Sequence, residues 1–219
     1  MTEVKNRRPL ASRQAGWAVR ISRWLAGTRI TPNQISMAGM IAALIAGACF
    51  WAADGVSGGL RSLLFVAAAL FVQLRLLCNL FDGMVAIEAG RASPDGGFWN
   101  EFPDRISDML ILMGVALCIE SPALGWAATG FAFLTAYVRE LGVNVGAGAD
   151  FAGPMAKPHR MALVTLAAIV SLAEPWWNGT GQVLRVALWV IIIGAAFTAL
   201  RRAWRLVGKL RRPKQDRAR

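Results

Sequence analysis

The sequence predicts an all-α integral membrane protein, and three observations support this fold class. Hydrophobic residues make up 56% of the 219 residues and charged residues only 17%, which is far more apolar than a water-soluble domain. Six segments are long enough to cross a bilayer, which takes roughly 20 apolar residues each. Lys and Arg gather outside these segments. The six expected spans are 34–53, 61–81, 105–121, 123–144, 160–175 and 183–203.

Positive charge is distributed unevenly along the chain, and its distribution predicts the topology. The net charge is +11, and Lys and Arg precede the first span, follow the last, and occur in the loops 82–104 and 145–160. The turns 54–60, 120–122 and 176–182 carry none. By the positive-inside rule, both termini and the two longer loops are cytoplasmic. For a bacterial host this means the inner (cytoplasmic) membrane. Topology and anionic lipids explain the basic character, so no nucleic acid partner is expected.

The chain is expected to divide into three parts. Residues 1–33 lack the continuous apolar core of a cleavable signal peptide. Within them, SRQAGWAVRISRWLAG mixes aromatic, aliphatic and Arg residues, a pattern typical of an amphipathic helix lying in the cytoplasmic interface. Residues 34–207 form the six-helix transmembrane domain, and 208–219 form a basic cytoplasmic tail.

Carboxylate and amide side chains are concentrated between the second and third expected spans. Asn79 and Asp82 are three residues apart, and Asn100, Asp104 and Asp108 follow at intervals of four, so each set shares a helical face. Oxygen ligands of this kind suit hard cations such as Mg²⁺. Ionisable groups at the edge of a membrane are costly and usually functional. We therefore predict a metal site with these five residues as ligands.

Glycines frame this acidic segment. Gly83 removes a side chain next to Asp82, where a bulky ligand could approach the backbone, and Gly96 makes the connecting stretch permissive. The alternative interpretation is a polar loop, whose aspartates cap helices and pair with Arg91 and Arg105. The whole constellation favours the metal site.

The second cytoplasmic loop carries a cluster of cations. Lys157, His159 and Arg160 precede the fifth span, and Arg139 lies near the end of the fourth. Arg binds phosphate oxygens bidentately and Lys binds them as a point charge. These residues are candidates for binding a phosphate or a lipid headgroup, although Lys and Arg also belong at cytoplasmic helix ends for topological reasons. The single histidine is interpreted as an ordinary interfacial residue.

The acidic segment resembles the signature of the CDP-alcohol phosphotransferases, D-x2-D-G-x2-A-R-x8-G-x3-D-x3-D. The spacing is intact, and the positions that match are Asp82, Gly83, Ala86, Gly96 and Asp104. Three positions depart from it, since Asn79 and Asn100 replace aspartates and Ile87 replaces the arginine. Segments outside the signature also resemble the family. These are TPNQIS at 31–36 and SPDG at 93–96. DRISD from Asp104 and AYVRE at 136–140 resemble the branch of the family that uses inositol phosphate, although neither fixes an acceptor.

The resemblance implies an enzyme that transfers a phosphatidyl group from CDP-diacylglycerol to an alcohol acceptor, with release of CMP. It implies one or two Mg²⁺ or Mn²⁺ ions on the pyrophosphate, Asp82 as the ligand shared by the ions, and Asp104 as the base. Membrane lipids and a second copy of the chain, as a homodimer, are expected partners. The expected substrate-binding residues are Pro32, Asn33, Gly83, Ala86, Arg91, Ser93, Gly96, Arg139, Lys157 and Arg160.

The two asparagines leave several possibilities open. The site could hold one metal ion, hold two ions more weakly, use Glu88, Glu101 or Asp108 in compensation, or have lost catalysis while keeping CDP-lipid binding. Arg91 could replace the arginine lost at position 87. An amino-alcohol phosphotransferase using a soluble CDP-alcohol is an alternative within the family. A small transporter is less favoured, because its polar residues would gather near the bilayer midplane. The retained aspartates favour an active enzyme.

Overall fold

The computed structural model describes residues 15–90, 94–177 and 179–211, and these ranges form helices joined by short connections. The all-helical class expected from the sequence is confirmed. In the described ranges, seven α-helices and one 3-10 helix occur in the order α1 Gly16–Ala26, α2 Pro32–Ala52, α3 Gly58–Glu88, α4 Gly96–Cys118, α5 Pro122–Asn144, α6 Lys157–Val170, η3 Ser171–Trp177 and α7 Gln182–Leu210.

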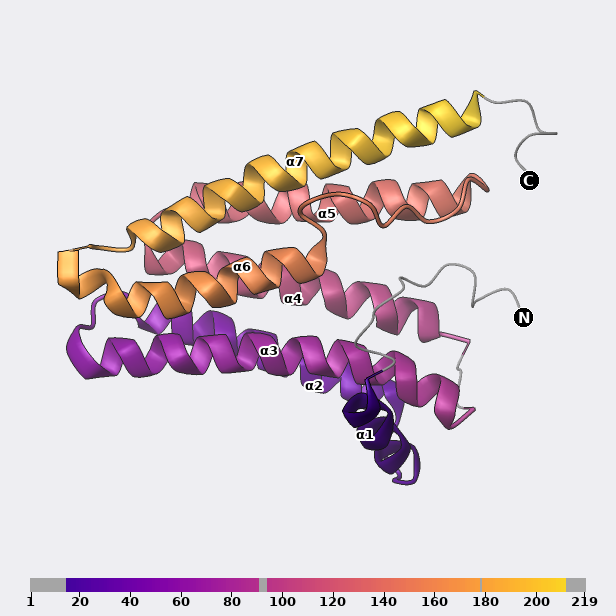
Figure 1. Ribbon diagram of the computed structural model, residues 1–219, viewed down its shortest axis with the longest axis horizontal. Coiled ribbons are helices and arrows are strands. Elements are labelled where there is room, and N and C mark those ends of the chain that lie inside the picture. The colour runs from indigo at the N-terminus through magenta and orange to yellow at the C-terminus, as the bar shows by residue number, and fades with distance from the viewer. Residues whose placement is uncertain (1–14, 91–93, 178, 212–219) are drawn as a thin grey trace.

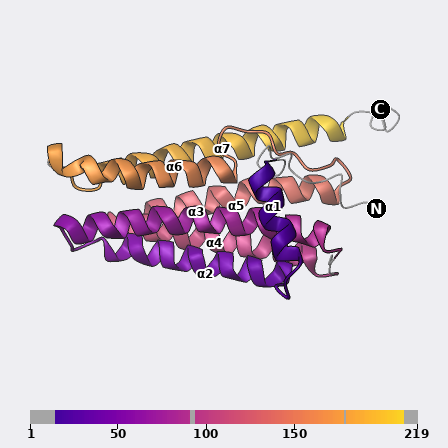
Figure 2. The ribbon, with the colours of Figure 1, turned by 60° about the horizontal axis from the view of Figure 1, so that its bottom comes forward.

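Helices α2 to α7 form an antiparallel bundle, and α1 lies across one end of it (Figures 1 and 2). α2 packs against α3 and α4, α5 packs against α4 and α7, and α3 also contacts α6. The end of the bundle where α3 finishes and α4 begins is called the site end below. α6 begins part-way along the bundle, whereas α3 and α7 continue further toward the site end (Figure 1).

The bundle belongs in a membrane. By length and composition, α2, α3 and α7 can each cross a bilayer. Large apolar side chains cover the outside of the bundle, including Leu70 at 65% exposure on α3 and Ile193 at 65% on α7. Exposed apolar surface on this scale is a liability in water and is stable against lipid.

The first two helices show how local sequence sets the helix ends. Thr31 and Gln34 form a reciprocal capping box at the start of α2, in which each side chain accepts a hydrogen bond from the other residue's backbone N–H. Pro32 follows at the first helical position, where its missing N–H costs nothing. The TPNQ sequence therefore starts a helix, whatever further role it has.

α3 is longer than its apolar segment. The sequence predicted a span ending at 81, but the helix continues to Glu88 and ends before Gly90, whose φ is +60°. Asp82 consequently lies inside the helix with its side chain buried, instead of in a loop after it. Gly83 lies in this stretch, but a single glycine inside a helix costs only about 1 kcal/mol, so the helix continues to Glu88.

Residues within 1–33 do form a helix, as expected. α1 packs against the last turns of α3, where Trp17 meets Phe81 edge-on with ring centroids 6.2 Å apart. Arg23 Nε lies 3.2 Å from Glu88 Oε1 at the same place. α1 thus braces the part of α3 that carries Asp82.

α2 and α4 cross in close backbone contact. A Cβ atom at Gly114 would lie 2.4 Å from the carbonyl oxygen of Gly47, and one at Gly47 would lie 2.4 Å from the carbonyl oxygen of Leu110. Both clashes are with backbone, which cannot move aside as a flexible side chain can. The two glycines let α4 approach α2 closely. This approach sets how far inside the bundle the aspartates on α4 lie.

Gly114→Ala should destabilise the protein by about 1–3 kcal/mol, because the new methyl group pushes the two helices apart. Gly130→Ala is the matched control, since Gly130 is also inside a helix and meets nothing within 4 Å. That change should be neutral or slightly stabilising because alanine is the better helix former. Thermal unfolding midpoints in detergent would check both. Equal midpoints for the two variants would contradict the close crossing.

Candidate active site

Two buried aspartates on α4 form the centre of the site. Asp104 and Asp108 are one turn apart, and both side chains face inward. Arg75 of α3 donates from Nη2 to Asp104 Oδ1 at 2.7 Å. Lys157, the first residue of α6, contacts the same oxygen, and Arg105 Nη2 lies 3.8 Å from Oδ2. Asp104 is therefore surrounded by three cations drawn from three helices.

Asp82 has a different environment. It is 7% exposed, accepts a hydrogen bond from Ser36 Oγ at 2.8 Å, and also accepts one from the backbone N–H of Gly83. It is close enough to Asp104 and to Lys157 to interact electrostatically with both. Within the described ranges, no Lys or Arg lies at salt-bridge distance from it. A buried carboxylate with hydrogen-bond donors but no salt-bridge partner fits a metal ligand.

The two asparagines of the signature lie in unlike surroundings. Asn79 is half-buried, and its Oδ1 accepts a hydrogen bond from Lys157 Nζ at 2.9 Å. Asn100 is exposed and lies beside Glu101, with Nδ2 3.5 Å from Oε1. Within the described ranges, no three His, Cys, Asp or Glu residues are grouped as a metal site would need. A metal ion here would have to combine carboxylate oxygens with amide oxygens.

Asp108 and Arg160 bind each other. Arg160 Nη2 lies 2.6 Å from Asp108 Oδ2, and the two side chains are 1% and 0% exposed. Arg160 also donates to the carbonyl oxygen of Met155 at 3.0 Å and lies 3.4 Å from Thr135 Oγ1. The sequence predicted Asp108 as a metal ligand and Arg160 as a substrate ligand. The structure gives both a further role, since together they join α4 to α6.

Arg139 is also paired. It contacts Glu101 of α4, binds Glu140 through Nε at 2.8 Å, and lies over the ring of Phe151. The loop between α5 and α6 is held against α7, where Arg202 Nε donates to the carbonyl oxygen of Ala152 at 2.9 Å. Arg139 therefore stands at the site end between α4 and this loop.

Three of the other predicted residues, Asn33, Ala86 and Gly96, lie at the site end of α2, α3 and α4. Asn33 Nδ2 lies 3.5 Å from Asp95 Oδ2, which connects the start of α2 to the start of α4. Gly96 is the first residue of α4, and Ala86 is half-buried on α3. Arg91 and Ser93 lie outside the described residues, so the expected substitution of Arg91 for the missing arginine stays a prediction.

Three residues of the site had no site role in the sequence-based prediction. Ser36 binds Asp82, whereas Arg75 and Arg105 bind Asp104. A charge inside an apolar segment was the available signal for Arg75. Several buried polar atoms here have no hydrogen-bond partner in the described part of the chain, among them Arg75 Nη1 and Arg105 Nε. Buried N–H groups are normally satisfied, so these two can bind an anion or water.

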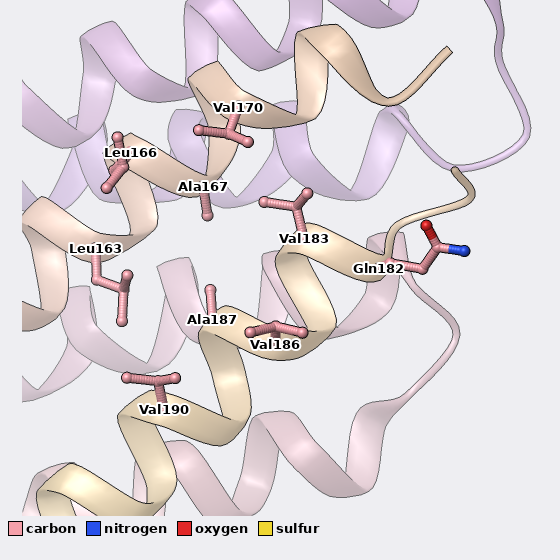
Figure 3. Close-up of a pocket in the computed structure, with 9 residues that line it drawn as sticks. All are labelled: Leu163, Leu166, Ala167, Val170, Gln182, Val183, Val186, Ala187 and Val190. Atoms are coloured by element: carbon pink, nitrogen blue, oxygen red, sulfur yellow. The ribbon is translucent and has the colours of Figure 1, made fainter. Parts of the chain in front are cut away.

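A groove of a different kind lies between α6 and α7, toward the end of the bundle opposite the site (Figure 3). Its volume is about 310 Å³. Leu163, Leu166, Val186 and Val190 line it, and Gln182 is the polar residue at its edge. It can hold hydrocarbon, but it offers no charged group to a phosphate.

The sequence matches no protein-family model. It is 30% identical over 209 residues to the phosphatidylinositol phosphate synthase of Cutibacterium acnes, an alignment that covers 86% of this chain and 93% of that protein. The chain belongs to the CDP-alcohol phosphotransferase family. The archaetidylinositol phosphate synthase of Pyrococcus horikoshii is 28% identical over 71% of this chain and 78% of its own length.

The fold is also that of a solved family member. The phosphatidylinositol phosphate synthase of Mycobacterium tuberculosis, in a crystal structure with CDP-DAG bound, superimposes with a TM-score of 0.73 at 20% identity. The match covers 91% of this chain and 99% of that one. A second structure of the same protein, in complex with manganese and citrate, gives a TM-score of 0.71 and covers 90% of this chain and 93% of that one.

Asp108→Asn should destabilise the protein by about 3–5 kcal/mol, because it leaves the Arg160 charge buried without its partner. Glu140→Gln is the control, since it removes a carboxylate from a half-exposed pair at the surface and should cost less than about 1 kcal/mol. The double variant Asp108→Asn/Arg160→Met should recover part of the loss. Unfolding midpoints in detergent would measure all three. A mild effect of Asp108→Asn would show that the pair contributes little to stability.

Proposed function

We propose that this chain transfers a phosphatidyl group from CDP-diacylglycerol to the hydroxyl of an alcohol acceptor and releases CMP. The observation that carries the proposal is the pair of buried aspartates, Asp82 and Asp104, at two positions of the family signature. The named synthases among its relatives, and the CDP-DAG bound to the structural neighbour, support the donor.

The chemistry of the site suits attack on a pyrophosphate. The donor is an anion, and Arg75 and Arg105, which both lie beside Asp104, each keep a buried N–H group without a hydrogen-bond partner in the described residues. Asp104 takes the proton of the acceptor hydroxyl. The hydroxyl oxygen then forms a bond to the phosphorus of the phosphatidyl group, the bond from phosphorus to the CMP oxygen breaks, and CMP leaves with the electron pair.

A divalent ion, Mg²⁺ or Mn²⁺, when bound, neutralises the pyrophosphate and stabilises the leaving phosphate. Asp82 and Asp104 would hold it, with the amide oxygens of Asn79 and Asn100 as further candidates. The residues fit such an ion because Asp82 is buried with no salt-bridge partner in the described ranges. The manganese complex of the Mycobacterium tuberculosis protein supports a divalent metal.

For the acceptor, we propose an inositol phosphate. The relatives that carry the names of inositol phosphate synthases support this choice, as does the resemblance of the segments at Asp104 and Arg139 to that branch. The acceptor's phosphate would bind the cations at the site end, with Arg139 and Lys157 as candidates. Arg91 and Ser93 are assigned to substrate binding from the sequence.

For the membrane topology, we infer six spans, α2 to α7, with both termini in the cytoplasm and α1 in the interface of the inner membrane. α4 and α5 have 23 residues each, or about 35 Å, which exceeds the roughly 30 Å of a bilayer core. α6 and η3 together have a similar length. The exposed Trp24 and Trp176 at opposite ends fit an aromatic belt. A homodimer is part of the same proposal.

The activity should appear as CMP release when protein in detergent is given CDP-diacylglycerol, Mn²⁺ or Mg²⁺, and inositol phosphate. A panel of other alcohols would test the choice of acceptor. Asp82→Asn and Asp104→Asn should each reduce the rate by about 10²-fold or more. Asp54→Asn, at the exposed far end of the bundle, is the control and should keep full activity. Binding of CDP-diacylglycerol without CMP from any acceptor would instead identify a non-catalytic member of the family.

Single cysteines introduced at Gly55 and Gly179 should react with an impermeant maleimide from outside the cell, and one at Gly146 only after lysis. The parent for these variants lacks Cys49, Cys78 and Cys118. The result at Gly179 decides the topology. If only α2, α3 and α7 crossed the membrane, Gly179 would lie on the same side as Gly146, and labelling it from outside would be impossible.

A further inference from the structure

Lys157 makes two contacts that a metal ion could make. Its Nζ atom lies 2.9 Å from Asn79 Oδ1 and contacts Asp104 Oδ1. These oxygens come from α3 and α4, and they belong to the first and last positions of the family signature. We propose that the Lys157 ammonium takes the place of a second cation, so that this chain binds one divalent ion where the signature provides for two. The inference deepens the proposed function and rests on it.

The Lys157 ammonium is buried in its position between Asn79 and Asp104. The Lys157 side chain is 14% exposed, and it begins at the first residue of α6, whose backbone position is set by the helix that follows. Arg160, one turn further along α6, is fixed by its buried pair with Asp108. The Lys157 side chain therefore extends from an anchored turn toward α3 and α4.

The charges at the signature positions are consistent with Lys157 in place of a second divalent cation. Four aspartates would set four negative charges against two dications. This chain keeps two of them, Asp82 and Asp104, because positions 79 and 100 are asparagine. Two dications together with Lys157 would leave a large positive excess before any substrate binds. One dication together with Lys157 leaves a smaller excess, to which Arg75 and Arg105 also contribute, and the anionic pyrophosphate supplies the remainder.

The asparagine at position 79 suits an ammonium ion particularly well. A neutral amide oxygen can accept a hydrogen bond from Lys157, but it brings no charge with which to bind a dication tightly. The single divalent ion would then lie on the Asp82 side, where the buried carboxylate has no Lys or Arg at salt-bridge distance in the described ranges. Lys157 would present a fixed positive charge on the Asn79 side.

Counting bound ions tests the proposal without relying on activity. Mn²⁺ would be titrated into the full-length protein in detergent, with free Mn²⁺ measured from its electron paramagnetic resonance signal. The wild type should bind one ion per chain. The triple variant Asn79→Asp/Asn100→Asp/Lys157→Met restores the carboxylates and removes the ammonium. It should bind two ions, with the line broadening that neighbouring Mn²⁺ ions produce.

A matched control distinguishes the effect of removing Lys157 itself from the effect of lowering the net charge of the protein. The variant Asn79→Asp/Asn100→Asp/Lys209→Met has the same net charge but keeps Lys157, and Lys209 lies on α7, where it bonds to the carbonyl oxygen of Ala147. It should bind its second ion at least about tenfold more weakly than the triple variant. Two ions in the wild type, no ion in the wild type, or equal second affinities in these two variants would each overturn the proposal.

A single substitution keeps the test open if the triple variant does not fold. Lys157→Met alone should tighten binding of the first Mn²⁺ by about tenfold, because a positive charge next to the ion is removed. Unchanged or weaker binding would overturn the proposal. The CMP assay distinguishes its failure from that of the proposed function. One bound ion without CMP release refutes the function alone, whereas two bound ions with CMP release refute only the role of Lys157.

Discussion

A row of buried charges between α3, α4 and α6 is the constraint on which this bundle depends. Asp104 and Asp108 present two carboxylates on successive turns of α4, and Arg75, Lys157 and Arg160 meet them from the two neighbouring helices. Charges taken out of water are stable only when their partners are placed accurately. Each pair therefore fixes the register of one helix against another, and a small slide of α6 would break two contacts at once.

The apolar parts of the bundle make this register possible. Gly47 and Gly114 let α4 lie close against α2, and the capping box at Thr31 fixes where α2 begins. Ser36, one turn into α2, can then reach Asp82 on α3. The site is thus built on the close contact of α2 with α4, and Ser36 and Asp82 take the positions that this contact leaves.

The sequence predicts the helices well because their signals are local. Apolar runs of bilayer length locate α2, α5 and α7, and the spacing of Asp82, Gly96 and Asp104 predicts the candidate site. The cross-helix partners have no such signal. Spacing along one helix shows that Asp104 and Asp108 share a face, but it does not show which helix that face meets. The pair of Asp108 with Arg160 and the contact of Asn79 with Lys157 depend on tertiary register, so they became visible only in the structure.

The late start of α6 has a consequence for the kind of molecule that can react here. This helix begins part-way along the bundle (Figure 1), and its first residue, Lys157, contacts Asn79, well before the end of α3 at Glu88. A CDP-lipid has a hydrocarbon part and a nucleotide part, so it dissolves fully in neither the bilayer nor water. If the reacting bond lies below the ends of the neighbouring helices, it is at the boundary between the bilayer and water. The hydrocarbon chains can then stay in the bilayer throughout the reaction, and only the nucleotide part has to enter from water and leave to it.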